Sequence, residues 1–166
     1  MFMESIMLNN TQIKHKIKRI AYQIYEANFN SKTLVLAGIA HNGFILAKKL
    51  KTVLKNISPL EIVLCEVTID KKNPLNPITT SLNAEDYKNT SLVLVDDVLN
   101  SGTTLMYAVK HFLEVPLKQF KTAVLVDRNH KKYPVKADFK GISLSTSLQE
   151  HVQVRFKGNT AKAYLQ

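Results

Sequence analysis

Two adjacent carboxylates follow a buried apolar run in the middle of the chain. Val93, Leu94 and Val95 are typical of a short strand that is buried on both faces of a parallel sheet. Asp96 and Asp97 come next, and we expect them to end this strand. Because open α/β sheets bind ligands beyond the carboxyl ends of their strands, this pair is the first candidate for chemistry.

A small polar turn follows the acids and leads into a helical pattern that restarts at Leu105. Its residues, called the phosphate turn below, are Asn100, Ser101, Gly102, Thr103 and Thr104. Free backbone N–H groups and the positive end of the helix dipole favour a phosphate here, and Gly102 lets the backbone come close to it. An ordinary strand-to-helix loop is the alternative, since Ser, Thr and Asp are common at helix starts. A nucleoside-triphosphate P-loop is excluded because no G-x-x-x-x-G-K-[ST] pattern occurs in the chain.

Strands and helices alternate around this motif. Apolar runs predict strands at 33–39, 60–69 and 120–127, and helical spacing predicts helices from 11 to about 28, from 42 to 50 and at 105–113. Shorter extended pieces are expected at 133–135, 137–142 and 151–156, whereas residues 70–90 have no sustained period and read as a long loop. This order predicts one α/β domain over residues 1–166, with a doubly wound, mainly parallel sheet and a small C-terminal β-rich hood.

The composition is that of an ordinary globular protein with a strong basic surplus. The chain has 23 basic and 13 acidic residues, a formal net charge of +10, which indicates phosphorylated small molecules or nucleic acid as partners. Cys65 is the single cysteine, so no disulfide can form within the chain, and its apolar surroundings suit a buried side chain. No run approaches the roughly 18 apolar residues of a membrane span, and Met1 to Asn10 lacks the pattern of a signal peptide. We therefore expect a cytoplasmic protein without a membrane partner.

A specific resemblance rests on the run Val95-Asp96-Asp97-Val98-Leu99-Asn100-Ser101-Gly102-Thr103-Thr104. It resembles the phosphoribosyl-pyrophosphate (PRPP) loop of type I phosphoribosyltransferases, in which strand, acid pair, glycine turn and helix occur in this order. The resemblance implies the fold of that family. It also implies that Asp96 and Asp97 hold the ribose, directly or through Mg²⁺, and that the phosphate turn binds the 5′-phosphate.

The C-terminal part narrows the resemblance to the PyrR group of pyrimidine-operon regulators, which also carry uracil phosphoribosyltransferase activity. The residues that carry it are Asp127-Arg128-Asn129-His130, then Pro134, then Lys136-Ala137-Asp138-Phe139-Lys140-Gly141 and Ser145-Thr146-Ser147. By this resemblance Phe139 stacks on the base, with the Lys140 backbone and the Thr146 side chain near the base edge. A core position for the Phe139 ring is the alternative.

The same resemblance assigns two further loops. The pyrophosphate loop comprises Ala40, His41, Asn42 and Gly43, and residues 70–90 form a flap, called so below, in which Lys71 and Lys72 face the reacting centre. Closure of a flap would keep water away from an oxocarbenium-like ribosyl centre.

Three departures from the usual PyrR pattern reduce the positive charge around pyrophosphate. His41-Asn42-Gly43 replaces Thr-Arg-Gly, Thr103 replaces an Arg, and Lys71-Lys72-Asn73 replaces a Tyr-Arg pair. A neutral His offers only a hydrogen bond where Arg offers a permanent charge. Asn100 stands where purine-using relatives commonly carry an Asp base, and an amide cannot accept the proton, so a pyrimidine or a non-catalytic ligand is favoured over hypoxanthine or guanine.

Two hypotheses of different classes follow. The first is a Mg²⁺-dependent phosphoribosyltransferase that converts PRPP and a nitrogenous base, uracil foremost, into a nucleoside monophosphate and pyrophosphate. The second is a nucleotide-sensing, RNA-binding regulator of pyrimidine genes with weak or no catalysis, which the +10 charge and the altered pyrophosphate loop favour. Self-association as a homodimer or higher homo-oligomer is expected from the family alone.

Overall fold

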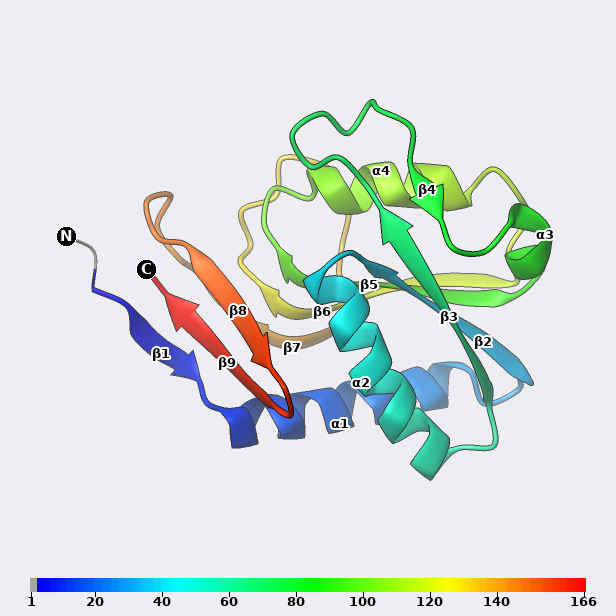
Figure 1. The fold of residues 1–166 in the computed structure, drawn as a ribbon, viewed down its shortest axis with the longest axis horizontal. Helices are drawn as coiled ribbons and strands as arrows, with labels where there is room; N and C mark the ends of the chain where they lie inside the picture. Colours follow the sequence, from blue (N-terminus) through cyan, green and yellow to red (C-terminus); the bar gives the residue numbers. More distant parts are fainter. Residues whose placement is uncertain (1–2) are drawn as a thin grey trace.

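The computed structural model describes residues 3–166, which form one large sheet covered by helices on both faces and a second, smaller sheet (Figure 1). The strands are β1 (Ser5–Leu8), β2 (Thr33–Ile39), β3 (Glu61–Thr68), β4 (Thr79–Thr80), β5 (Ser91–Leu99), β6 (Gln119–Asp127), β7 (Phe139–Ser143), β8 (Val152–Lys157) and β9 (Thr160–Leu165). The helices are α1 (Asn10–Ala27), α2 (Asn42–Ile57), α3 (Ala84–Tyr87) and α4 (Thr103–Phe112).

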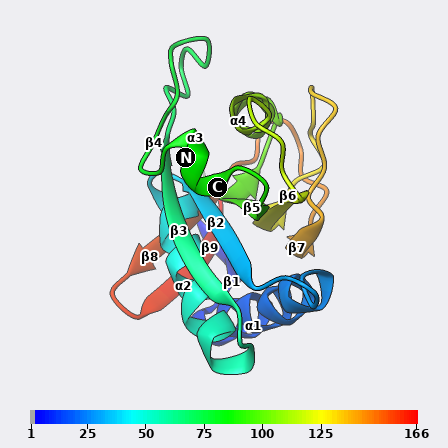
Figure 2. The same cartoon turned by 90° about the vertical axis from the view of Figure 1, so that its right-hand side faces the viewer.

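The large sheet has the strand order β4-β3-β2-β5-β6-β7. All neighbours from β3 to β7 are parallel, and only β4 runs antiparallel, on β3. Helices α1 and α2 pack on one face and α3 and α4 on the other, as Figure 2 shows with the sheet between the two layers. The predicted doubly wound, mainly parallel α/β fold is confirmed. Its central strands β2 and β5 are also the ones that lead into the predicted pyrophosphate loop and phosphate turn.

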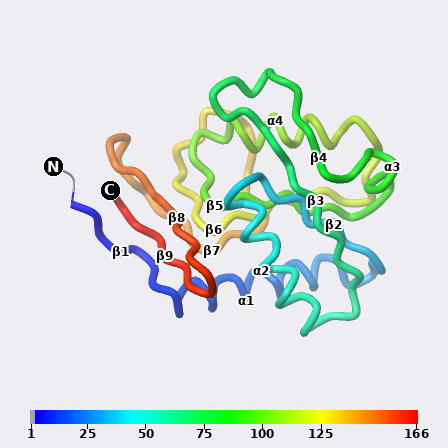
Figure 3. The backbone as a smooth tube through the Cα atoms, in the orientation of Figure 1, coloured from blue at the N-terminus to red at the C-terminus, as the bar shows by residue number. Residues whose placement is uncertain are grey.

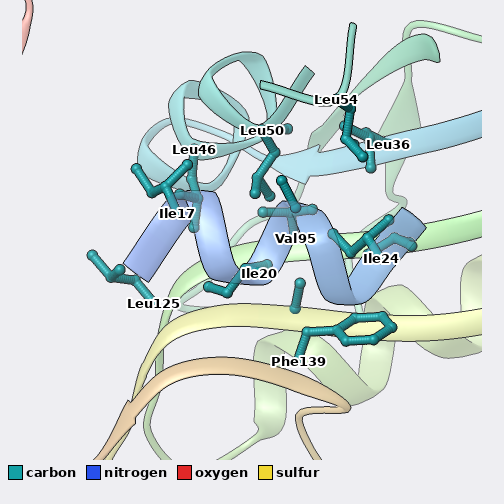
Figure 4. Packing of buried hydrophobic residues seen from close by; sticks show 14 of the residues in the cluster. Ile17, Ile20, Ile24, Leu36, Leu46, Leu50, Leu54, Val95, Leu125 and Phe139 are labelled. Carbon is teal, nitrogen blue, oxygen red and sulfur yellow. The ribbon is translucent and has the colours of Figure 1, made fainter. Parts of the chain in front are cut away.

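The first core lies between the sheet and α1 with α2. Asn9 caps α1 in a reciprocal box with Gln12, and isoleucines at helical spacing face inward (Figure 4). Ile20 and Ile24 are fully buried there, against strand residues of the sheet. Burial of each such side chain contributes about 2 kcal/mol, so α1 is fixed mainly by packing.

The small sheet is built from both ends of the chain. Its order is β1-β9-β8, all antiparallel, and the smooth trace of Figure 3 shows β1 beside the two C-terminal strands. The hood was predicted to be formed by C-terminal residues alone, but it also contains the N-terminal strand β1. Ser5–Leu8 was not expected to be a strand, because its pairing partner lies at the other end of the sequence.

Three local expectations need correction. β5 does not end at the acid pair, because Val98 and Leu99 continue the ladder opposite Val126 and Asp127 of β6. The segment 70–90 is not loop throughout: it holds β4 and α3, and Tyr87 of α3 packs edge-on against Phe112. Residues 133–135 form no strand.

The structure also bears on the predictions that Cys65 is buried and that no segment spans a membrane. Cys65 is a free, buried thiol in β3, and burial raises its pKa. No helix within residues 3–166 is long and apolar enough to cross a membrane.

Candidate active site

The acid pair lies near the carboxyl end of β5, within the strand. Asp96 is only 5% exposed, and its Oδ1 accepts the Asp97 N–H at 2.9 Å. Asp97 is half-buried, and its Oδ1 accepts the Val98 N–H at 2.9 Å. Burial raises the pKa of the Asp96 carboxyl well above its usual value, the Asp97 charge adds to this, and Lys71 opposes it.

The phosphate turn connects β5 to α4 in a conformation that only glycine adopts easily. Gly102 has φ +86°, and a Cβ there would lie 2.7 Å from Val135 Cγ1. The Ser101 and Thr103 hydroxyls lie 2.8 Å apart, and the Ser101 carbonyl accepts the Lys132 N–H at 2.7 Å. Helix α4 has no side-chain cap from its N-cap residue Gly102, and the Thr103 N–H donates to Ser101 Oγ at 3.3 Å. The next N–H groups of its first turn are available to an anion.

One cavity joins the acid pair, the phosphate turn and Lys71, whereas the pyrophosphate loop and the predicted base-side residues do not line it. It has a volume of about 110 Å³ and is lined by the acid pair, the phosphate turn, Lys71, Val98, Leu99, Leu105 and Val124. Lys71 thus comes from the flap into the same space as the carboxylates, whereas Lys72 does not line it. A cation, two carboxylates and a helix N-terminus around one small space suit a phosphorylated sugar better than an apolar ligand.

The pyrophosphate loop meets the acid pair from the neighbouring strand. Ala40 N–H donates to the Val67 carbonyl at 2.9 Å, the Ala40–His41 peptide bond is cis, and α2 begins at Asn42. A Cβ on Gly43 would lie 2.6 Å from the Val95 carbonyl oxygen, so only glycine lets α2 start this close to β5.

The Asn42 side chain is already engaged inside the protein. Its Nδ2 donates to Asp97 Oδ2 at 3.0 Å and to the Val154 carbonyl of β8 at 2.9 Å. Asn42 therefore connects the acid pair to the hood, a role that the sequence did not indicate.

Asp70 organises the start of the flap. Its Oδ1 accepts the N–H groups of Lys72 and Asn73, and its Oδ2 accepts from Asn76 Nδ2. These hydrogen bonds lower the pKa of the Asp70 carboxyl. The turn that follows Asp70 therefore has a defined local shape, and Lys71 within it faces the cavity.

Phe139 is a core residue, which corrects the expectation that its ring stacks on a base. It is 8% exposed and belongs to the cluster under α1, where Figure 4 shows its ring near Ile24. Phe139 is the first residue of β7 and pairs with Ala123 of β6. Ala123 lies four residues before Asp127, the last residue of β6. The ring is therefore placed for packing under the helix layer and not at the ligand edge.

The side chains of the other two predicted base-side residues reach the end of β6, although Lys140 itself pairs with Val124. Lys140 Nζ is 3.8 Å from Asp127 Oδ2, and Thr146 Oγ1 accepts from Arg128 Nε at 3.0 Å. Arg128 also donates to Asn100 Oδ1 at 3.0 Å, so it touches the phosphate turn as well. The sequence analysis named Arg128 only as part of the C-terminal signature and gave it no role in the site.

Comparison with known proteins agrees with this geometry. The phosphoribosyl transferase domain family matches residues 5–157, nearly the whole chain. The chain belongs to the phosphoribosyltransferase family. Its PyrR-like character is shown by relatives named "Bifunctional protein PyrR": one from Pediococcus pentosaceus is 32% identical over 162 residues, 92% of each chain, and one from Leuconostoc mesenteroides is 34% identical over 157 residues, 89% of each.

Solved phosphoribosyltransferases share the fold. A hypoxanthine-guanine phosphoribosyltransferase from Bacillus anthracis has a TM-score of 0.73 at 19% identity and covers 87% of this chain and 84% of its own. A hypoxanthine phosphoribosyltransferase from Trypanosoma cruzi has a TM-score of 0.77 at 15% identity and covers 96% and 95%. At these identities the likeness concerns architecture, and the base must be argued from the site.

The residues of this phosphoribosyltransferase fit a magnesium ion that the ligand helps to hold. No group of three or more His, Cys, Asp or Glu side chains within residues 3–166 could bind a metal by itself. Asp96 and Asp97 supply carboxylate oxygens at the edge of the cavity, and Mg²⁺ is commonly bound by one or two carboxylates together with phosphate oxygens and water. A site completed by pyrophosphate therefore suits this pair.

Proposed function

We propose that this phosphoribosyltransferase transfers the phosphoribosyl group of PRPP to a nitrogenous base, with uracil favoured, in a Mg²⁺-dependent reaction that yields a nucleoside monophosphate and pyrophosphate. The observation that carries the proposal is the single cavity shared by Asp96, Asp97, Lys71 and the phosphate turn. Each group has a matching part of PRPP: hydroxyls for the acids, pyrophosphate for the lysine and the 5′-phosphate for the turn.

In the proposed reaction the bond from ribose C1 to pyrophosphate breaks, a bond from C1 to a ring nitrogen forms, and that nitrogen gives its proton to the departing pyrophosphate or to water. The phosphate turn holds the 5′-phosphate and Asp97 holds the ribose hydroxyls, which fixes C1 between the base and the leaving group. Mg²⁺, when bound, neutralises charge on the departing pyrophosphate. Lys71 adds a positive charge on the same side, and closure of the flap excludes water.

Asn100 favours a pyrimidine over a purine. Its side chain is an amide held by Arg128, and an amide cannot take a proton from a base. A reaction that needs an acidic side chain at this place to accept that proton is therefore disfavoured.

The direct test is pyrophosphate release from PRPP with Mg²⁺ and each of uracil, hypoxanthine and guanine. We expect release with uracil that stops when the metal is chelated. If none of the three bases leads to pyrophosphate release at any concentration, the proposal is overturned. If hypoxanthine or guanine leads to release and uracil does not, the choice of a pyrimidine is overturned.

A second function, RNA binding as a nucleotide-sensing regulator, is favoured by a basic groove between α1 and α2. Lys14, Lys18, Lys48 and Lys49 line this groove, on a chain with a net charge of +10. Binding to the leader transcript of its own operon should weaken steeply with salt and change with UMP. Equal affinity for an unrelated RNA of the same length would contradict a regulatory role.

Two further features of the proposal concern the state of the protein in the cell. We propose a homodimer or higher homo-oligomer, in line with the family, and a cytoplasmic location, in line with the free thiol of Cys65. Light scattering on the purified chain measures the first. Cell fractionation measures the second.

A further inference from the structure

Arg128 is a buried cation that has no acidic partner. The residue is only 6% exposed, and within residues 3–166 no carboxylate oxygen lies within 4.0 Å of its guanidinium. Burying an unpaired charge is costly, so such a group persists only where its hydrogen bonds are satisfied. All of its contacts are therefore informative.

The guanidinium joins two segments that are far apart in sequence. Nη1 donates to Asn100 Oδ1 at 3.0 Å in the phosphate turn. On the other side, Nε donates to Thr146 Oγ1 at 3.0 Å, and Nη2 donates to the carbonyls of Ser147, at 3.3 Å, and Glu150. Residues 144–150, called the hood link below, connect β7 to β8 of the hood.

Arg128 is itself fixed to the strand that carries the acid pair. Its backbone N–H donates to the Leu99 carbonyl at 3.1 Å, directly before the phosphate turn. The fork geometry of a guanidinium holds several acceptors in one fixed arrangement, which a single ammonium group cannot do. A movement of the phosphate turn should therefore displace the Arg128 guanidinium and, through it, the hood link.

We propose that Arg128 is a positioning residue that couples the phosphate turn to the hood link and orients Asn100 as a hydrogen-bond donor toward the ligand. The orientation follows from chemistry, because a guanidinium only donates and the Asn100 oxygen must face it. The Asn100 NH₂ group is then left for the cavity that Asn100 lines. The ligand atom beside Asn100 should be an acceptor, such as a carbonyl or phosphate oxygen; this part rests on the proposed function.

The coupling is tested first in the ligand-free chain by hydrogen exchange. Thr146→Val removes one acceptor on the hood side, and we expect faster exchange in the phosphate turn as well as in the hood link. Asn100→Ala removes the acceptor on the side of the phosphate turn, and we expect faster exchange in the hood link as well. Arg155→Gln serves as the control, because Arg155 lies on the hood surface and pairs with Glu4. Changes confined to the substituted segment in both variants would overturn the coupling.

The second arm adds UMP, with uridine for comparison. In the wild type, UMP but not uridine should slow exchange at least about threefold in both segments. In Arg128→Lys, which keeps the charge but loses the fork, protection should stay in the phosphate turn and disappear from the hood link. Equal protection of the hood link in Arg128→Lys would overturn the proposal. If UMP protects neither segment of the wild type, the proposed function fails while the ligand-free arm still decides the coupling.

Discussion

The phosphate turn and the pyrophosphate loop are built alike but differ in what they leave free. Both follow a central parallel strand, and both lead into a helix whose start has no side-chain cap. In the phosphate turn, Gly102 has a positive φ, and the first residues of α4, Thr103 to Leu105, line a cavity. In the pyrophosphate loop, the Asn42 side chain donates inward to Asp97 and to the hood.

This difference separates binding from catalysis. The residues of the phosphate turn line the cavity, and the Asn100 NH₂ group there is available to a ligand, whereas the pyrophosphate loop offers no permanent positive charge and its Asn42 amide donates to Asp97. Among residues 3–166, Lys71 is the cation that lines the shared cavity, so in the proposed function the positive charge near pyrophosphate comes from the flap. A site of this kind should bind the sugar phosphate well and depend strongly on Asp97 and Lys71 for turnover.

The largest effect is expected from Asp97→Asn. Loss of the carboxylate removes the charged acceptor for the ribose hydroxyls and one metal ligand, so kcat/KM for pyrophosphate release should fall about 10²- to 10³-fold. Glu61→Gln, an exposed carboxylate at the start of β3, is the matched control. An Asp97→Asn enzyme within threefold of wild type would mean that the ribose is held elsewhere.

Gly102→Ala tests the phosphate turn itself. The added Cβ meets Val135 at 2.7 Å in a left-handed backbone conformation, and UMP affinity should fall about tenfold or more. Gly158→Ala is the control, because Gly158 also has a positive φ, +58°, but has nothing within 4 Å of the added Cβ. Isothermal titration of UMP should therefore separate the two variants. Equal UMP affinity in both would show that the turn does not hold the phosphate.

Lys71→Ala and Lys72→Ala compare the two flap lysines. Lys71 lines the cavity, so its loss should raise the KM for PRPP about tenfold, the value of one charge-assisted contact. Lys72 does not line the cavity, and its loss should change the KM about twofold. Equal effects of the two substitutions would show that the flap acts only through its overall charge.

Asp96→Asn should stabilise the fold while it impairs function. Burial keeps the pKa of Asp96 above its usual value of 3.8, so the wild type loses stability as pH rises from about 4 toward the folded-state pKa. The variant lacks that loss, and its free energy of unfolding at pH 7 should exceed the wild-type value by about 1 kcal/mol. Urea unfolding at pH 4 and pH 7 measures this. If the difference in free energy of unfolding between Asp96→Asn and the wild type does not grow from pH 4 to pH 7, the buried-charge explanation is contradicted.

The parallel sheet and the two turns that follow its central strands could be predicted because local patterns specify them, whereas the role of the pyrophosphate loop came from the family resemblance. The apolar run at 93–95 and the strand-turn-helix order around Gly102 needed no distant information. β1 could not be predicted in this way, because Ser5–Leu8 is short and largely exposed and becomes a strand only by pairing with β9. The strand end at Leu99 was missed because Asp96 and Asp97 are poor strand formers that β6 holds in register.

The site could be predicted at residues whose type and neighbouring sequence indicate a ligand site by themselves. Asp97 and Gly102 were expected together from the order of strand, turn and helix, and both line one cavity. Lys71, which lines the same cavity, was expected there only from the family resemblance. Phe139 was assigned to the base from resemblance, but the face on which a strand residue points depends on register, and its ring lies in the core. Arg128 was quoted in the C-terminal signature, but its buried role was not predicted, because arginines are usually exposed and its burial depends on segments that converge only in the fold.

The most direct test of the central claim, that the phosphate turn is a 5′-phosphate site, compares UMP with uridine in isothermal titration against the wild type. The two ligands differ only in the phosphate. We predict that UMP binds at least about 100-fold more tightly than uridine, the size expected of several charge-assisted hydrogen bonds. Equal affinities for UMP and uridine would contradict the account.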